Sequence, residues 1–125
     1  MLLSIIIPVY NEELTIGNII DRTERVMRQT GLKFEVIVVD DHSYDKSLKA
    51  AKARDAKIFS LKQHLGKGYA LRAGFAHAIG DIIVTIDSDG SHKPEELPKV
   101  LAPILEGRAD LVIGSRWKSA CRERV

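Results

Sequence analysis

The chain has 125 residues, of which 45% are hydrophobic, with 19 basic and 17 acidic side chains and a net charge of +2. This length and composition predict one soluble globular domain over residues 1–125 and exclude a disordered chain. The near balance of charge provides no basic surface for nucleic acid, so no nucleic-acid partner is expected. A single cysteine excludes an internal disulfide and fits a reducing compartment, and no apolar run reaches the roughly 18 residues that span a bilayer. The expected location is therefore the cytoplasm, with any membrane contact peripheral and on the cytoplasmic face.

Strands and helices alternate along the chain. The apolar runs predict strands at residues 2–9, 34–39, 56–60, 81–86 and 109–113. Helical spacing of apolar residues predicts helices at residues 12–30, about 46–54, 68–79 and from 94 onwards. Such alternation with short connections is typical of right-handed βαβ units. We therefore expect an α/β fold with a mostly parallel sheet and helices on both faces.

Particular residues mark the ends and faces of these helices. Asn11 is expected to cap the first helix and Gly31 to end it, and Ser43 or Asp45 is expected to cap the second. The third helix is expected to place one set of residues on a common side: Leu71, Gly74, Phe75, Ala78 and Ile79.

Asp87 and Asp89 follow the apolar run 82–86, so two carboxylates emerge where a buried strand ends. Hard divalent cations such as Mg²⁺ or Mn²⁺ are held by carboxylate oxygens and usually also hold a substrate's phosphates. The pair therefore predicts a metal–diphosphate site, although acidic residues at a strand end also suit a turn or a helix cap. His92, close behind the pair, is either a cation ligand, a general base or an ordinary loop histidine.

Polar clusters also follow the first and second strands, and parallel strands bring their carboxyl ends to one edge, where the ligand crevice lies. Tyr10 suits stacking on a nucleobase, and Glu12 can accept hydrogen bonds from a ribose. The Asp41 carboxylate can accept from a ring N–H of uracil or guanine, or can simply start a turn. Together with Asp40 and the pair after the fourth strand, five carboxylates meet at this edge and repel each other unless a cation or a donor-rich ligand lies among them.

Gly66-Lys67-Gly68 resembles a phosphate loop without matching one in detail. Leu71 stands where the dinucleotide fingerprint requires a third glycine, and no Gly-Lys-Ser/Thr is present. Two interpretations stay open: Lys67 opens a helix and faces a phosphate, or the glycines belong to an ordinary turn.

Six segments occur in the order seen in inverting family 2 glycosyltransferases: Ile6–Glu12, Val38–Asp45, Gly66–Leu71, Ala78–Asp81, Asp87–Asp89 and Gly114–Arg116. Within that family the chain most resembles the polyprenyl-phosphate (dolichyl-phosphate) mannosyl- and glucosyltransferases. The resemblance implies a Rossmann-like fold of the glycosyltransferase A type. It also implies transfer of a sugar from a donor such as GDP-mannose or UDP-glucose to polyprenyl phosphate at a membrane surface.

The resemblance also implies a set of site residues. Those implied to hold the nucleotide are Pro8, Tyr10, Glu12, Val39, Asp41, Lys67, Ser88 and Arg116. Asp87 and Asp89 are the implied catalytic residues and, with Ser91, the implied ligands of Mg²⁺ or Mn²⁺. Ser91 stands where relatives often carry a glutamine, and Gly90 replaces a usual leucine, so the third metal ligand is left open.

Family members continue past the Gly-Ser-Arg motif into a segment that binds the acceptor. A chain that ends at Val125 is therefore expected to bind the donor but to transfer sugar poorly by itself, with a partner chain or oligomer supplying the acceptor site. Two alternatives are a nucleotide-sugar-binding module without turnover and a sugar nucleotidyltransferase. The second normally carries a glycine-rich basic signature near its first strand, which residues 8–12 do not match.

Overall fold

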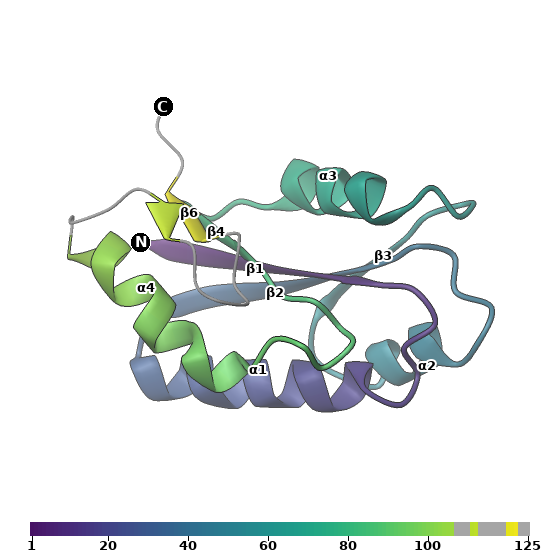
Figure 1. Ribbon diagram of the computed structural model, residues 1–125, viewed down its shortest axis with the longest axis horizontal. Coiled ribbons are helices and arrows are strands. Elements are labelled where there is room, and N and C mark those ends of the chain that lie inside the picture. The colour runs from purple at the N-terminus through teal and green to yellow at the C-terminus, as the bar shows by residue number, and fades with distance from the viewer. Residues whose placement is uncertain (107–110, 113–119, 123–125) are drawn as a thin grey trace.

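A computed structural model describes residues 1–106 and the backbone of residues 111–112 and 120–122 (Figure 1). The strands are β1 (Leu2–Val9), β2 (Lys33–Asp40), β3 (Lys57–Ser60), β4 (Ile82–Thr85), β5 (Leu111–Val112) and β6 (Ala120–Arg122). The helices are α1 (Ile16–Thr30), α2 (Ser47–Lys52), α3 (Lys67–His77) and α4 (Leu97–Leu105), and a short 3-10 helix, η1 (Pro94–Glu96), precedes α4.

The six strands form one sheet in the order β3-β2-β1-β4-β6-β5. Strand β1 pairs in parallel with β2 and β4, and β2 pairs in parallel with β3. Strand β6 runs antiparallel to both β4 and β5. The expected mostly parallel α/β sheet is therefore confirmed. The expected strand at 109–113 is described only at its centre, and β6 has no counterpart among the expected strands.

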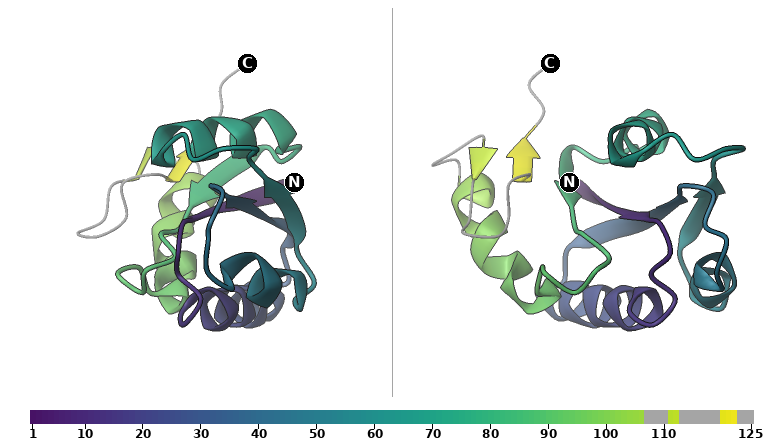
Figure 2. Two further views of the ribbon diagram at one scale, coloured as in Figure 1. Left: turned by 90° about the vertical axis from the view of Figure 1, so that its right-hand side faces the viewer. Right: turned by 45° about the vertical axis from the view of Figure 1, so that its right-hand side comes forward.

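Strand β1 explains why helices cover both faces of the sheet. Successive side chains of a strand point to opposite faces, so a strand that is apolar at nearly every position must be covered twice. Leu3, Ile5 and Ile7 pack in the larger core cluster with residues of α1 and α4, whereas Ile6 packs in a second cluster with Ala70 of α3. Figures 1 and 2 show α3 over one face and α1, α2 and α4 over the other.

Of the polar residues expected to cap helices, Asn11 and Ser43 instead join two loops, whereas Asp45 accepts from the N–H of Ser47, the first residue of α2, at 2.8 Å. Gly31 does end α1, with φ +72° and its N–H on the Arg28 carbonyl at 3.2 Å. Asn11, however, lies five residues before α1 at φ +53°, and its side-chain oxygen accepts from the Tyr44 N–H at 3.0 Å. The Ser43 hydroxyl oxygen accepts from the Asn11 N–H at 2.9 Å. These bonds join the loop after β1 to the loop after β2, so both loops are held at the same edge of the sheet.

Helix α3 buries only part of the expected side: Gly74 is buried and Leu71 and Ala78 pack against the second core cluster, but two of the five residues face outwards. Ala70 and Gly74 are buried, but Phe75 is 47% exposed and Ile79 is 70% exposed. A Cβ atom on Gly74 would lie 2.5 Å from the Ile6 side chain. At Gly74 the helix approaches β1 so closely that only a glycine fits there, whereas Phe75 and Ile79 face outwards.

A buried carboxylate at the amino end of the sheet makes stability depend on pH. The Glu35 side chain is 7% exposed and accepts from Ser4 Oγ at 2.5 Å, Lys57 Nζ at 2.7 Å and the Ile79 N–H at 2.9 Å. Burial opposes ionisation, but these hydrogen bonds outweigh it and lower the pKa of Glu35 below its ordinary value. A lowered folded-state pKa contributes stability above the unfolded-state pKa, and this stability is lost as pH falls through the folded-state pKa.

Thermal melts of the wild type and Glu35→Gln between about pH 6 and about pH 3 test this effect. We expect the wild type to lose more stability than the variant in the acid part of this range. An equal loss in both proteins would show that Glu35 does not contribute to the acid sensitivity.

Among the residues that the structure describes, no helix is both long and apolar enough to cross a membrane.

Candidate functional site

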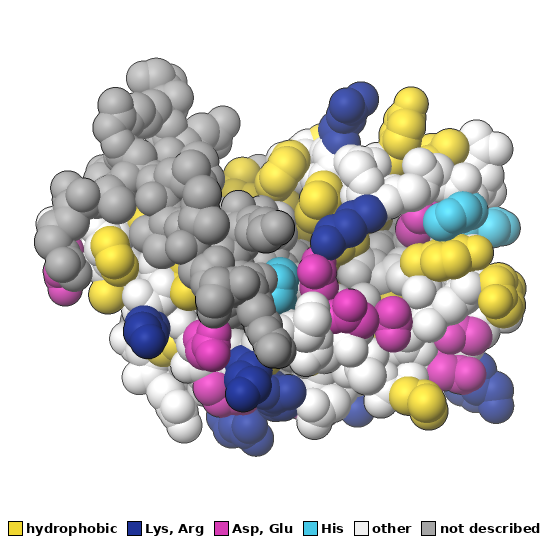
Figure 3. Space-filling model, in the orientation of Figure 1, with side chains coloured by type: hydrophobic (Ala, Val, Ile, Leu, Met, Phe, Trp, Pro, Cys, Tyr) yellow, Lys and Arg dark blue, Asp and Glu magenta, His cyan; other side chains and the backbone are white. Residues whose placement is uncertain are grey.

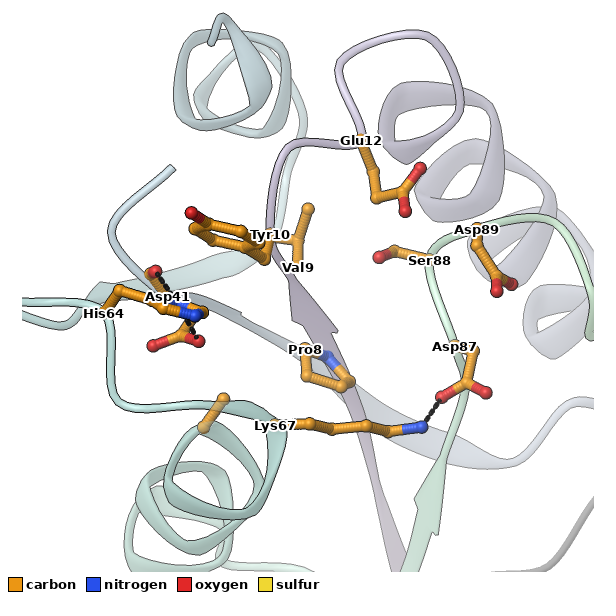
Figure 4. A pocket seen from close by; sticks show the side chains of 11 residues that line it. Pro8, Val9, Tyr10, Glu12, Asp41, His64, Lys67, Asp87, Ser88 and Asp89 are labelled. Carbon is orange, nitrogen blue, oxygen red and sulfur yellow. Dashed lines mark hydrogen bonds and ion pairs between the residues drawn. The ribbon is translucent and has the colours of Figure 1, made fainter. Parts of the chain in front are cut away.

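A pocket of about 270 Å³ lies at the carboxyl ends of β1, β2 and β4 (Figure 4). Its lining comes from these strand ends and from the start of α3, and comprises Pro8, Val9, Tyr10, Glu12, Asp41, His64, Lys67, Ala70, Asp87, Ser88 and Asp89. On the face seen in Figure 3, acidic side chains gather near the middle, beside basic and histidine side chains. The topology thus brings together the three polar strand ends, as the parallel order predicts.

Three of the implied site residues are not among the residues that line this pocket. Val39 is fully buried and packs with Ile37 in the cluster under α3, so its side chain is a core residue. Ser91 contacts Asp89 from outside the lining. Arg116 lies outside the described residues.

Asp87, the first residue of the acidic pair, is held by Lys67 on one side and by His92 on the other. Lys67 Nζ forms an ion pair with Asp87 Oδ1, which Figure 4 marks with a dashed line. The backbone N–H of Asp87 donates to His92 Nδ1 at 2.9 Å, and His92 Nε2 lies 3.7 Å from Asp87 Oδ2. Because His92 is 8% exposed and absent from the pocket lining, its part in the site is to position Asp87.

Asp89 is exposed and strongly favours its ionised form. Hydrogen bonds from the Ser91 side chain and backbone N–H, the latter at 2.8 Å, lower the pKa of Asp89, and attraction to His92 and Lys67 adds to this against a partial opposing effect of burial. Ser91 therefore supports Asp89 as a hydrogen-bond donor, and its implied role as a metal ligand stays a prediction.

The donor set fits a hard divalent cation that shares its ligands with a phosphate. Within the described part of the chain, no three His, Cys, Asp or Glu residues converge as a complete metal cage. Mg²⁺ typically keeps several waters and binds through one or two carboxylates plus substrate phosphates. Asp87 and Asp89 supply that pair of carboxylates on the rim of the pocket.

The repulsion expected among five carboxylates is partly relieved by donors of the protein. Asp40 accepts from the Ser43 N–H at 3.2 Å and from its hydroxyl at 2.6 Å. Asp41 accepts from the backbone N–H groups of Leu65 and Gly66. Of the other three carboxylates at the pocket, Asp87 is paired with Lys67, and Glu12 and Asp89 complete the acidic part of the lining.

The opposite side of the pocket carries aromatic rings. Tyr10 stacks on His64 with ring centroids 4.0 Å apart and meets Tyr44 edge-on at 6.2 Å. His64 is not among the site residues expected from the sequence, and its position two residues before Gly66-Lys67-Gly68 is the only sequence signal that points to it. The pocket is thus aromatic at one side and charged at the other, which suits a ligand with a flat ring and an anionic group.

Residues 4–124 match the family model described as Glycosyl transferase family 2. The chain belongs to this family, and its Rossmann-like α/β sheet is the glycosyltransferase A fold expected from the sequence.

Solved structures share this fold. Mannosyl-3-phosphoglycerate synthase from Rubrobacter xylanophilus is 28% identical, with a TM-score of 0.74 over 83% of this chain and 36% of that one. Glucosyl-3-phosphoglycerate synthase from Mycobacterium tuberculosis is 35% identical, with a TM-score of 0.71 over 82% and 40%. A complex of that synthase with Mn²⁺, UDP-glucose and phosphoglyceric acid is 32% identical, with a TM-score of 0.72 over 87% and 41%. The chain thus spans about two fifths of the length of these neighbours.

Proposed function

We propose that the protein binds a nucleoside diphosphate sugar together with Mg²⁺ or Mn²⁺ and transfers the sugar to an anionic acceptor. The observation that carries this proposal is the convergence of Asp87, Asp89 and Lys67 with the aromatic strand end at Tyr10 around one pocket. Membership of the family supports a glycosyl transfer over the alternative of a sugar nucleotidyltransferase.

In this proposal the acidic and basic residues of the pocket have different roles. The carboxylates of Asp87 and Asp89 would hold the metal, which when bound neutralises charge that develops on the leaving nucleoside diphosphate. Lys67, in the first turn of α3, brings a second positive charge to the same end of the pocket. Glu12, in the loop after β1, would accept hydrogen bonds from ribose hydroxyls, and Pro8 and Ser88 line the same pocket.

The acceptor is proposed only as a class. The sequence resemblance implies polyprenyl phosphate, whereas a structural neighbour was crystallised with phosphoglyceric acid. Both molecules are anionic and carry a phosphate. UDP-glucose is the first donor to test, because it is the donor in the same complex.

Isothermal titration of the protein with UDP and GDP, in Mn²⁺ and then in EDTA, tests the binding part of the proposal. We expect clearly tighter binding with the metal, and equal affinity in EDTA would overturn it. Incubation with radiolabelled UDP-glucose or GDP-mannose and either polyprenyl phosphate or 3-phosphoglyceric acid then tests transfer. Label in the lipid phase identifies the first acceptor, and label in an anionic water-soluble product identifies the second. Metal-dependent donor binding with no labelled product would favour a binding module without turnover.

A further inference from the structure

The Asp41 carboxylate is largely occupied within the protein. Its Oδ1 accepts from the Leu65 N–H at 2.8 Å, and its Oδ2 accepts from the Gly66 N–H at 2.9 Å and lies 2.8 Å from His64 Nδ1. The Asp41 side chain is 3% exposed. A carboxylate has about four acceptor positions, and three of these are engaged here. Because the side chain is almost fully buried and at most one acceptor position is left, Asp41 offers little to a nucleobase unless donors that also shape the start of α3 are displaced.

His64 lies between this buried carboxylate and the pocket. Its side chain is 50% exposed, lines the pocket and stacks on Tyr10 with an interplanar angle of 24° (Figure 4). Carboxylate oxygens only accept hydrogen bonds, so Nδ1 carries the proton that points at Asp41. The neutral ring then has a lone pair at Nε2. Among the described residues Nε2 makes no hydrogen bond, so it is the polar atom that the ring can offer to a ligand.

We propose that His64, held by Asp41, reads the base of the nucleotide: Nε2 accepts a hydrogen bond from a base that carries a ring N–H. Uracil and guanine carry this group, whereas cytosine and adenine carry a lone pair at the corresponding ring position. Two opposed lone pairs leave both groups without a partner in a partly dry site, which typically costs a factor of ten or more in affinity. Asp41 is then a positioning residue that sets the tautomer of His64. This inference rests on the proposed function, because it assigns the base subsite of the same pocket.

Competitive titration of UDP and CDP in saturating Mn²⁺ tests the proposal, because the two ligands differ only in the base. We expect the wild type to prefer UDP by about tenfold. His64→Phe keeps a flat ring on Tyr10 and removes the acceptor, so it should bind UDP and CDP with similar affinity. His77→Phe is the matched control, since His77 stacks on Phe59 at the far end of α3 and is not among the pocket-lining residues. It should keep the wild-type preference.

Asp41→Asn distinguishes base reading from a purely structural role, because only base reading predicts a change in the relative affinity for UDP and CDP. The asparagine amide can donate to His64 Nδ1, which places the ring proton on Nε2 and converts the reader from acceptor to donor. The preference should then shift towards CDP. If circular dichroism shows that this variant is unfolded, His64→Phe decides the question alone.

The outcomes separate this inference from the function on which it rests. A wild-type protein that binds neither nucleotide, with or without metal, overturns the proposed function and the inference together. Metal-dependent binding of UDP and CDP with equal affinity overturns the inference alone. A His64→Phe variant that still prefers UDP also overturns the inference, because another residue must then determine the base preference.

Discussion

Asp89→Ala is expected to remove most of the Mn²⁺-dependent gain in affinity for UDP. Asp89 is exposed at the rim of the pocket, and its lowered pKa favours the ionised form that the proposed metal site needs. Its partner Asp87 is ion-paired with Lys67, so Asp89 is the more accessible of the two carboxylates. Losing one charged ligand should cost about 2 kcal/mol, or about thirtyfold in the dissociation constant.

Titration of UDP with and without Mn²⁺ measures this loss directly. The matched control is Asp55→Ala, which removes an exposed carboxylate in the turn before β3, away from the carboxyl ends of the strands. The control should retain the full metal dependence. An Asp89→Ala variant whose affinity rises with Mn²⁺ as steeply as in the wild type would assign the metal to other residues. Circular dichroism of the variant shows whether the fold is kept, which we expect because Asp89 is exposed.

Gly80→Ala is expected to produce the largest loss of stability among glycine-to-alanine substitutions in the part of the chain that the structure describes. A Cβ atom at Gly80 would lie 2.5 Å from Ser4 Oγ, 2.7 Å from the Ser4 nitrogen and 2.8 Å from the Leu2 carbonyl oxygen. Two of these atoms belong to the backbone of β1, which is paired on both sides and cannot easily move. The Gly80 N–H also donates to Ser4 Oγ at 2.8 Å, and the same hydroxyl donates to Glu35.

The expected cost combines overpacking with disruption of this buried hydrogen-bond network, about 2–4 kcal/mol of unfolding free energy. For a domain of this size, the melting temperature should fall by roughly 8–15 °C. Gly68→Ala is the control, because a Cβ there meets nothing within 4 Å and alanine favours the helix. Thermal melts followed by circular dichroism compare the two, and similar melting temperatures would show that β1 adjusts without cost. UDP binding below the melting transition should be retained, since Gly80 lies at the opposite end of the sheet from the pocket.

The role proposed for His64 can be compared with base preference in the structural neighbours. They are similar to this chain over 82–87% of its length, and one was crystallised with UDP-glucose. If His64 reads the base through a tautomer set by Asp41, base choice is controlled by a pair of residues about 20 positions apart in the sequence. Substituting Asp41 and His64 together should then change the base preference and leave the proposed metal site at Asp87 and Asp89 unchanged.

Local patterns in the sequence determined the elements and the edge of the sheet where the pocket lies. The continuous apolar run at 2–9 predicted β1 with its exact bounds, because a strand covered on both faces must be apolar throughout. The alternation of strands and helices predicted parallel pairing, and parallel pairing brings the residues after β1, β2 and β4 to one edge. Asp87, Asp89, Glu12 and Tyr10 could therefore be placed together from the sequence alone.

Hydrogen-bond partners distant in the chain were decided only by the tertiary structure. Asn11 and Ser43 have the chemistry of helix caps, yet each bonds to the other loop, and no local pattern distinguishes these uses. Asp41 turned inwards because the loop before α3 supplies N–H donors, and the same loop brought His64 onto Tyr10. Periodicity predicts which face of an element is buried, but it does not predict how closely a neighbouring element approaches. The close contact of Gly74 with Ile6 depends on that distance and therefore on the assembled fold.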